Sequence, residues 1–111
     1  MIENTIIKAN NMGRKAAVFS LEFPSLHLVE LAAHVGFDAV NIDGEHGYFP
    51  TDTIDDICRV ANGYNMSVTA RVPDSTPYWV NLFLDRGVQG ITGPHINNEK
   101  EAQNLSDACL F

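Results

Sequence analysis

The chain has 111 residues, of which 45% are hydrophobic and 19% charged, and its formal net charge is −7 at pH 7. These values are typical of one globular domain, and the acidic balance argues against a nucleic-acid partner, since nucleic-acid-binding domains present a basic face. The N-terminus lacks the basic region and apolar core of a signal peptide, and no apolar stretch approaches the ~18 residues of a membrane span. Cys58 and Cys109 have no metal-type spacing, so we expect reduced thiols in a cytoplasmic protein.

Apolar periodicity predicts helices and strands in alternation. Glu3 to Asn11 predicts a short helix, and the continuous apolar run Lys15 to Leu21 predicts a strand buried on both faces. A helix begins at Pro24-Ser25 and ends at Gly36, and Phe37 to Ile42 is a second buried strand. A helix capped by Thr51 or Asp52 and stopped by Asn62-Gly63 follows, and then a strand from Met66 to Val72. The next helix runs from Thr76-Pro77 to Gly87, with Trp79 and Phe83 in the core, and leads to a strand from Val88 to Thr92. The last helix is capped by Asn98 and has an apolar face of Ala102, Leu105, Ala108 and Cys109.

A helix followed by four β-α units predicts an α/β fold with a parallel sheet. Two architectures fit this order: a doubly wound sheet, or part of a (β/α)8 barrel, which needs roughly 250 residues when complete. The chain closes on the apolar pair Leu110-Phe111 with no polar tail. We therefore expect residues 1–111 to form one partial domain of a larger protein, and a natural short protein that pairs with its own copy is the less favoured alternative.

Ligands of parallel α/β sheets bind at the carboxyl ends of the strands. The residues expected at those ends are Ser20 and Glu22 after the first strand, Asp43, Glu45 and His46 after the second, Arg71 after the third, and Thr92, Pro94 and His95 after the fourth. Arginine can hold a carboxylate through two parallel hydrogen bonds, and histidine can transfer protons near neutral pH. The set therefore fits a small anionic substrate.

Structural interpretations compete with these functional ones. Arg71 can instead pair with a neighbouring acid such as Asp74, and Glu45 can serve only to fix its loop. His46 and His95 can be exposed loop residues. His27 and His34, on the first helix after the first strand, are expected at the surface or in packing.

Several segments resemble the HpcH/HpaI aldolase family in matching order and spacing. They are Gly36-Phe37-Asp38, Asp43-Gly44-Glu45-His46-Gly47, Ala70-Arg71-Val72-Pro73, Leu84-Asp85-Arg86-Gly87-Val88-Gln89-Gly90-Ile91, and Gly93-Pro94-His95-Ile96-Asn97-Asn98 with Glu101-Ala102. The family comprises class II pyruvate aldolases, including 2,4-dihydroxyhept-2-ene-1,7-dioate aldolase and 2-keto-3-deoxy sugar-acid aldolases, which serve aromatic or sugar-acid catabolism. The resemblance implies a (β/α)8 barrel of which this chain is roughly the first half.

The resemblance also implies roles for individual residues. His46 matches the family's acid/base histidine, and Arg71 matches the arginine that holds the pyruvyl group and stabilises its enolate. Asp43 and Glu45 match the acidic residues that support the histidine. Asp85 matches an aspartate that pairs with the histidine, yet it falls at the end of a helix, at the opposite rim from the strand ends. We therefore expect a homo-oligomer in which Asp85 serves a neighbouring subunit's site.

The family holds a divalent metal (Mg²⁺, Mn²⁺ or Co²⁺) through a Glu and an Asp from later strands, and no metal ligand in this chain corresponds to them. The lysines Lys8, Lys15 and Lys100 are not at carboxyl ends of strands, so no Schiff-base lysine is expected either. The family's reaction is cleavage of 4-hydroxy-2-oxo acids to pyruvate and an aldehyde, and we expect the 111-residue chain alone to be inactive. The alternatives are a citryl- or malyl-CoA-type lyase of the same superfamily, and a non-catalytic binding module that retains the fold.

Overall fold

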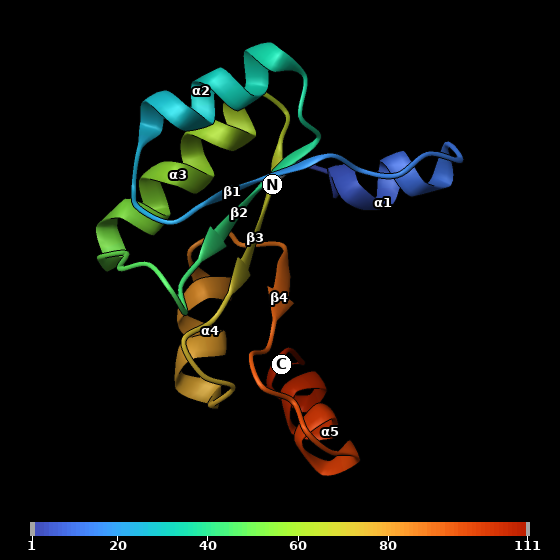
Figure 1. The fold of residues 1–111 in the computed structure, drawn as a ribbon, viewed down its shortest axis with the longest axis vertical. Helices are drawn as coiled ribbons and strands as arrows, with labels where there is room; N and C mark the ends of the chain where they lie inside the picture. The colour runs from blue at the N-terminus through green and yellow to red at the C-terminus, as the bar shows by residue number, and fades with distance from the viewer. Residues whose placement is uncertain (1, 111) are drawn as a thin grey trace.

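The computed structural model describes residues 2–110, which form a helix followed by four β-α units (Figure 1). Met1 and Phe111 lie outside the described residues. The expectation drawn from the apolar pair Leu110-Phe111 therefore lies partly outside them. The elements are α1 (Thr5–Asn11), β1 (Val18–Leu21), α2 (Leu26–Val35), β2 (Ala39–Asp43), α3 (Thr51–Gly63), β3 (Ser67–Arg71), α4 (Pro77–Asp85), β4 (Gly90–Thr92) and α5 (Glu99–Ala108).

The four strands are parallel and lie in the order β1-β2-β3-β4. A doubly wound sheet reverses its strand order at a switch point and carries helices on both faces. Here the order never reverses, and one core joins α2, α3 and α4 to the same face of the sheet. The arrangement is that of the first four units of a (β/α)8 barrel, as expected, and the doubly wound alternative is wrong.

Alternation of side chains along each strand separates this core from the opposite face. Leu21, Ile42 and Ala70 are in register on adjacent strands and are buried in the core. On the other face, the side chains of Ser20, Asn41 and Thr69 form a row in which Asn41 Nδ2 donates to Ser20 Oγ at 3.2 Å. Thr69 Oγ1 donates to Asn41 Oδ1 at 2.9 Å. The face that would line a barrel interior is therefore polar.

Helix α1 closes the sheet at the amino ends of the strands. Thr5 N donates to Ser67 Oγ at 2.8 Å, and Ser67 N returns a bond to Thr5 Oγ1 at 3.0 Å. Thr5 Oγ1 also donates to the carbonyl of Asp38, which precedes β2. These bonds satisfy the hydrogen-bonding groups of Ser67, which is buried. Helix α1 thus lies at the amino ends of the strands and leaves their carboxyl ends open.

The first strand differs most from its prediction. It begins at Val18 rather than Lys15, and it is exposed on one face, with Val18 39% exposed and Ser20 also exposed. The reason is its place at the edge of the sheet, where no described strand or helix covers it. The predicted burial on both faces is therefore wrong for this strand. Strand β2 begins two residues later and ends one residue later than predicted, β3 is shorter by one residue at each end, and β4 begins two residues later.

The signals at helix ends were predicted with mixed success. Asn98 caps α5 through a side-chain bond to Glu101 N, as predicted. Helix α2 begins after Ser25, which bonds to Leu28 N, and Gly36 ends it in the left-handed conformation. The predicted cap of α3 by Thr51 or Asp52 is wrong, since Pro50 holds that position without a side-chain bond. The stop at Asn62-Gly63 is also displaced, because Gly63 is still helical and Asn65 takes the positive φ of 59°.

Helix α5 is less buried than its apolar spacing predicts. Leu105, Ala108 and Cys109 pack against the core, but Ala102 is exposed, and no residue of α5 is fully buried. Trp79 and Phe83 on α4 belong to the core, as predicted.

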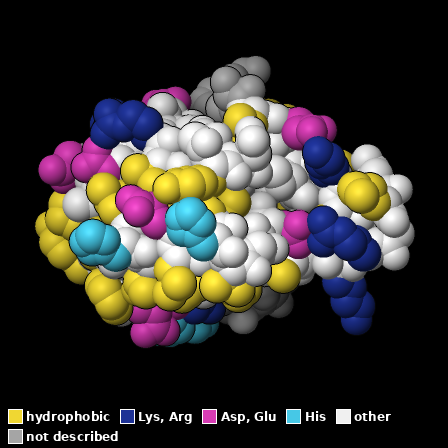
Figure 2. All heavy atoms as spheres, turned by 90° about the horizontal axis from the view of Figure 1, so that it is seen from above, with side chains coloured by type: hydrophobic (Ala, Val, Ile, Leu, Met, Phe, Trp, Pro, Cys, Tyr) yellow, Lys and Arg dark blue, Asp and Glu magenta, His cyan; other side chains and the backbone are white. Residues whose placement is uncertain are grey.

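At the end of the molecule where α2 and α3 lie, hydrophobic side chains gather on one half of the surface, among acidic and His side chains (Figure 2). No helix within residues 2–110 is long and apolar enough to cross a membrane.

Candidate active site

Asp43 is the buried centre of a polar cluster at the carboxyl ends of β2 and β3. It is the last residue of β2 and is only 3% exposed. Its Oδ1 accepts bonds from the backbone N–H groups of Glu45 and His46, at 3.2 and 3.1 Å. The loop after β2 therefore folds back on its own carboxylate, and this turn places the His46 side chain above the strand end.

Arg71 is the cross-strand partner of Asp43 and holds it with two bonds. The two residues are paired in register, and Arg71 Nε and Nη2 donate to Asp43 Oδ1 and Oδ2 at 3.2 and 2.7 Å. This side-chain bond from Arg71 is the main reason that the pKa of Asp43 lies far below its usual range, with a smaller contribution from bonds to His46. The same bond raises the pKa of Arg71. Asp43 is therefore ionised, and the alternative pairing of Arg71 with Asp74 is wrong, because Asp74 accepts from Thr76 N instead.

His46 joins this pair through one ring nitrogen. Nδ1 lies 3.0 Å from Asp43 Oδ2 and 2.8 Å from Arg71 Nη2. A single Nδ1 can donate to the carboxylate when it carries a proton, or accept from the guanidinium when it does not, but it cannot do both. The His46 side chain is 61% exposed, and its other nitrogen, Nε2, lies 3.6 Å from Glu45 Oε1, beyond hydrogen-bond distance.

Glu45 lies among side-chain nitrogen atoms of Arg71, His46 and His95. Its Oε1 lies 3.4 Å from Arg71 Nε and 3.6 Å from His46 Nε2, while its Oε2 lies 2.7 Å from His95 Nε2. The Glu45 side chain is 15% exposed. The structure thus brings His95, on the loop after β4, to the cluster; its position at a strand end was the only signal in the sequence.

Two glycines allow the loop after β2 to lie this close to its neighbours. A Cβ atom on Gly47 would overlap the backbone carbonyl of Glu22, and one on Gly44 would lie 2.8 Å from the carbonyl oxygen of Arg71. Neither neighbour is a flexible side chain that could move aside. The loop that carries Glu45 and His46 is therefore clamped between the loop after β1 and the end of β3.

The other predicted site residues lie around this cluster without joining it. Ser20 bonds to Asn41 within the sheet, and Glu22 contributes its backbone carbonyl beside Gly47 and a weak charge effect on Arg71. The backbone carbonyl of Thr92 accepts from Val72 N, and Pro94 is half-buried in the loop before His95. His27 and His34 are exposed on α2, as expected, and His34 packs edge-on against Tyr64.

Asp85 lies away from the cluster. It is exposed and is the last residue of α4. Gln89, four residues later, bonds through its N–H to the carbonyl of Val68, near the start of β3. The end of α4 is therefore next to the amino ends of the strands, opposite the edge that carries His46, as the alternation of helices and strands predicts.

The described residues do not make a metal site. Within residues 2–110, no group of three or more His, Cys, Asp or Glu side chains is arranged to hold a metal ion. The two oxygens of Asp43 are already directed at Arg71, His46 and backbone N–H groups, which compete with a cation for the same lone pairs. A metal ion placed on Asp43 would therefore have to displace the contacts that hold the cluster together.

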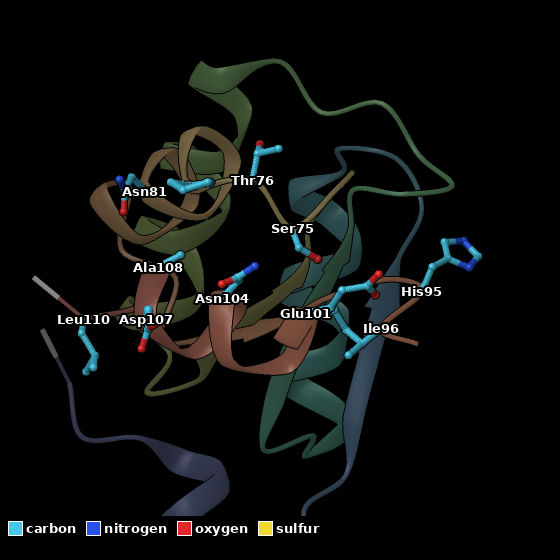
Figure 3. Close-up of a pocket in the computed structure, with 11 residues that line it drawn as sticks. Ser75, Thr76, Asn81, His95, Ile96, Glu101, Asn104, Asp107, Ala108 and Leu110 are labelled. Carbon is cyan, nitrogen blue, oxygen red and sulfur yellow. The ribbon is translucent and has the colours of Figure 1, made fainter. Parts of the chain in front are cut away.

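A groove of about 740 Å³ lies between α4 and α5, next to the cluster (Figure 3). Its lining residues are Ser75, Thr76, Pro77, Asn81, His95, Ile96, Glu101, Asn104, Asp107, Ala108 and Leu110. Figure 3 shows the His95 ring at one end of this groove, turned away from its interior. Among residues 2–110, His95 alone both lines the groove and forms an ion-pair contact with the cluster.

The cluster can bind an anion and transfer a proton, within limits set by charge. Two carboxylates and one guanidinium leave one negative charge in excess when the histidines are neutral. An anionic ligand must therefore either compete with Asp43 for the hydrogen bonds of Arg71 or bind together with a cation. A guanidinium beside an exposed imidazole nitrogen suits a small oxo acid that loses a proton during its reaction.

The chain is similar to known aldolases over most of its length. No family model matches it. A pyruvate aldolase of Rhizobium etli is 32% identical over 88 residues, which are 79% of this chain and 35% of that protein. A 4-hydroxy-2-oxo-heptane-1,7-dioate aldolase of Escherichia coli is 29% identical over 110 residues, which are 99% of this chain and 42% of that protein.

A solved structure shares the fold. An HpcH/HpaI aldolase from Desulfitobacterium hafniense superimposes with a TM-score of 0.86 at 22% identity, over 94% of this chain and 40% of that one. At this identity the superposition shows the fold alone. The chain thus spans less than half the length of the relatives that it matches.

Proposed function

We propose that this chain, which is similar to aldolases of 2-oxo acids over most of its length, carries the substrate-binding and proton-transfer part of a pyruvate aldolase. The reaction is cleavage of a 4-hydroxy-2-oxo acid to pyruvate and an aldehyde. The observation that carries the proposal is the contact of Asp43, His46 and Arg71 at the carboxyl ends of β2 and β3. Aldol cleavage needs a cationic group that binds the oxo acid and a base that takes a proton, and Arg71 and His46 supply these two groups.

Arg71 is the group that binds the oxo-acid end of the substrate. Its guanidinium has five N–H donors in a planar fork, and Asp43 uses two of its nitrogens. The Arg71 side chain is 35% exposed, so the rest of the fork is accessible to a carboxylate. As the C3–C4 bond breaks, its electron pair passes into the enolate of pyruvate, and the same positive charge stabilises the enolate oxygen.

His46 is the group that removes the proton. In the retro-aldol step a base takes the proton of the C4 hydroxyl, and C4 leaves as the carbonyl carbon of the aldehyde. When the substrate carboxylate draws Arg71 away, Nδ1–H of His46 donates to the ionised Asp43, and this tautomer leaves Nε2 without a proton. Nε2 then accepts the hydroxyl proton.

We also propose that residues 1–111 are the amino-terminal half-barrel of a longer polypeptide, in which a divalent metal is held by acidic residues of later strands. The coverage of 35–42% of the curated relatives supports the half-barrel. The excess negative charge of the cluster supports a requirement for an added cation, since an oxo acid would otherwise meet Asp43 and Glu45. On this proposal the 111-residue chain alone has no turnover.

The assembly and location belong to the same proposal. Asp85 lies at the opposite edge from His46 in its own chain, so pairing with a catalytic histidine requires a second subunit. The position of Asp85 supports a homo-oligomer on that ground.

The cysteines Cys58 and Cys109 are free thiols, and burial raises the pKa of the Cys58 thiol to about 12, which keeps it unreactive. Free thiols support a cytoplasmic location.

The test is release of pyruvate from 4-hydroxy-2-oxo acids, followed with lactate dehydrogenase and NADH. We expect the full-length protein to release pyruvate with Mg²⁺, Mn²⁺ or Co²⁺ and to lose the activity with a chelator. We expect no release from the 111-residue chain under any of these conditions. Metal-dependent turnover by the short chain would refute the division of the site. An inert full-length protein would favour a non-catalytic binding module with this fold.

A further inference from the structure

The groove between α4 and α5 is a cavity that the proposed reaction does not use. Its volume of about 740 Å³ is within the range of about 300–1,000 Å³ that small-molecule sites occupy. Pro77 and Asn81 line it from α4, and Glu101, Asn104 and Ala108 line it from α5. Residues three or four positions apart share one side of a helix, so each helix turns one continuous side towards the groove.

The groove presents uncharged polar groups that have no partner of their own. Within residues 2–110, the side chains of Ser75, Asn81 and Asn104 form no hydrogen bond with another described residue. Figure 3 shows the Asn104 side chain directed from α5 towards Ser75, on the loop before α4. An amide carries both donors and an acceptor, and a hydroxyl is both at once. These side chains therefore match the hydroxyl groups of a ligand, which also donate and accept.

The charges of the lining exclude an anionic ligand. Glu101 and Asp107 are carboxylates, and the described lining residues include no Lys or Arg. The imidazole of His95 is turned away from the interior (Figure 3) and lies 2.7 Å from Glu45. Carboxylates repel a phosphate or a carboxylate group but accept hydrogen bonds from hydroxyl groups. The oxo acid that we propose to bind at Arg71 therefore does not fit this groove.

We propose that the groove between α4 and α5 binds an uncharged polyol, as a second ligand site separate from the cluster at the ends of β2 and β3. The hydroxyl groups of the polyol exchange hydrogen bonds with Ser75, Asn81 and Asn104. Apolar lining residues such as Ile96 and Leu110 contact its C–H groups. The proposal does not depend on the aldolase reaction, because no group that we assign to bond cleavage lines the groove.

The experiment is a titration of the 111-residue chain with D-glucose, followed through the NMR signals of the side-chain NH2 groups of Asn81 and Asn104. We expect both signals to shift and to saturate. D-Glucuronate is the matched anionic probe, since it has a carboxylate in place of one CH2OH group. We expect it to bind at least about ten-fold more weakly, because Glu101 and Asp107 repel it. Unshifted amide signals with D-glucose, or equal binding of D-glucuronate, would overturn the proposal.

A pair of variants tests the amide contact. Asn104→Ala removes one amide and preserves the helix, since Asn104 is exposed on α5 and alanine is the better helix former. We expect D-glucose binding, read from the Asn81 signal, to weaken by about five-fold, the effect of one lost neutral hydrogen bond. Asn10→Ala is the control, because Asn10 is exposed on α1 and is not a lining residue. Wild-type affinity in Asn104→Ala, or an equal loss in Asn10→Ala, would show that the proposal is wrong.

Discussion

Replacing Asp43 by asparagine removes one oxygen acceptor from the centre of the cluster and keeps the other. Asparagine retains Oδ1, which accepts from the N–H groups of Glu45 and His46. At Oδ2 it places an NH2 group that faces Arg71 Nη2 at 2.7 Å and His46 Nδ1 at 3.0 Å. The substitution therefore removes the charge and the acceptor for Arg71 Nη2, and it keeps both the turn and the bond from Arg71 Nε to Oδ1.

The size of the effect follows from those contacts. A hydrogen bond to a charged group contributes about 1.5–3 kcal/mol. The Arg71 side chain is 35% exposed and regains water when it loses its partner, so we expect Asp43→Asn to lower the free energy of unfolding by about 2 kcal/mol. Asp56→Asn is the control. Asp56 and its partner Arg59 are 43% and 73% exposed, and such surface pairs contribute about 0.5 kcal/mol or less.

The pH dependence provides a second measurement of the same interaction. The pKa of Asp43 lies below its usual range in the folded state because of Arg71, whereas an unfolded aspartate has a pKa of about 3.9. The unfolded chain thus binds the proton first, and the stabilisation is present above about pH 4 and is lost as the pH falls towards the folded pKa. Urea unfolding of both chains at pH 7 and pH 3 measures this. Equal stability of Asp43→Asn and wild type at pH 7 would refute the reasoning.

Two further predictions concern the loops and helix ends that support the site. Gly47→Ala is expected to lower the free energy of unfolding by about 2–3 kcal/mol, because its Cβ overlaps the Glu22 carbonyl. Gly63→Ala, with open space around it inside α3, is expected to raise the free energy of unfolding by about 0.5–1 kcal/mol. If Gly47→Ala is as stable as Gly63→Ala, the close approach of Gly47 to Glu22 is contradicted. Asn98→Ala is expected to cost about 1 kcal/mol and to speed hydrogen exchange at the start of α5, whereas Thr76→Ala, at a cap without a side-chain bond, is expected to change little. Equal effects of the two cap substitutions would show that the Asn98 bond is unimportant.

The sequence predicted those features that depend on neighbours along the chain. The order of helices and strands follows from apolar periodicity, and the cap at Asn98 follows from residue type at a helix start. The exposure of β1 could not be predicted, because a buried strand and an edge strand have the same apolar composition and differ only in what lies beside them. The end of α3 was misplaced because Asn65, rather than Gly63, takes the left-handed conformation.

The candidate site divides in the same way. Asp43, His46 and Arg71 could be assigned to one edge because parallel strands share their carboxyl ends. Their mutual contacts depend on the register that pairs Asp43 with Arg71, which no local pattern specifies. The contact of His95 with Glu45 depends further on loop conformation, and the position after a strand end could only suggest it. The metal ligands and the role of Asp85 remain predictions from the resemblance.

The central claim is that His46 transfers the proton in the aldol reaction, and kcat of the full-length His46→Ala variant for pyruvate release tests it most directly. Positioned acid/base catalysis contributes about 10²–10⁴-fold to a rate, so we expect kcat to fall by that factor. His27→Ala, at an exposed histidine on α2, serves as the control and is expected to keep the wild-type kcat. A His46→Ala enzyme with the full wild-type kcat would contradict the account.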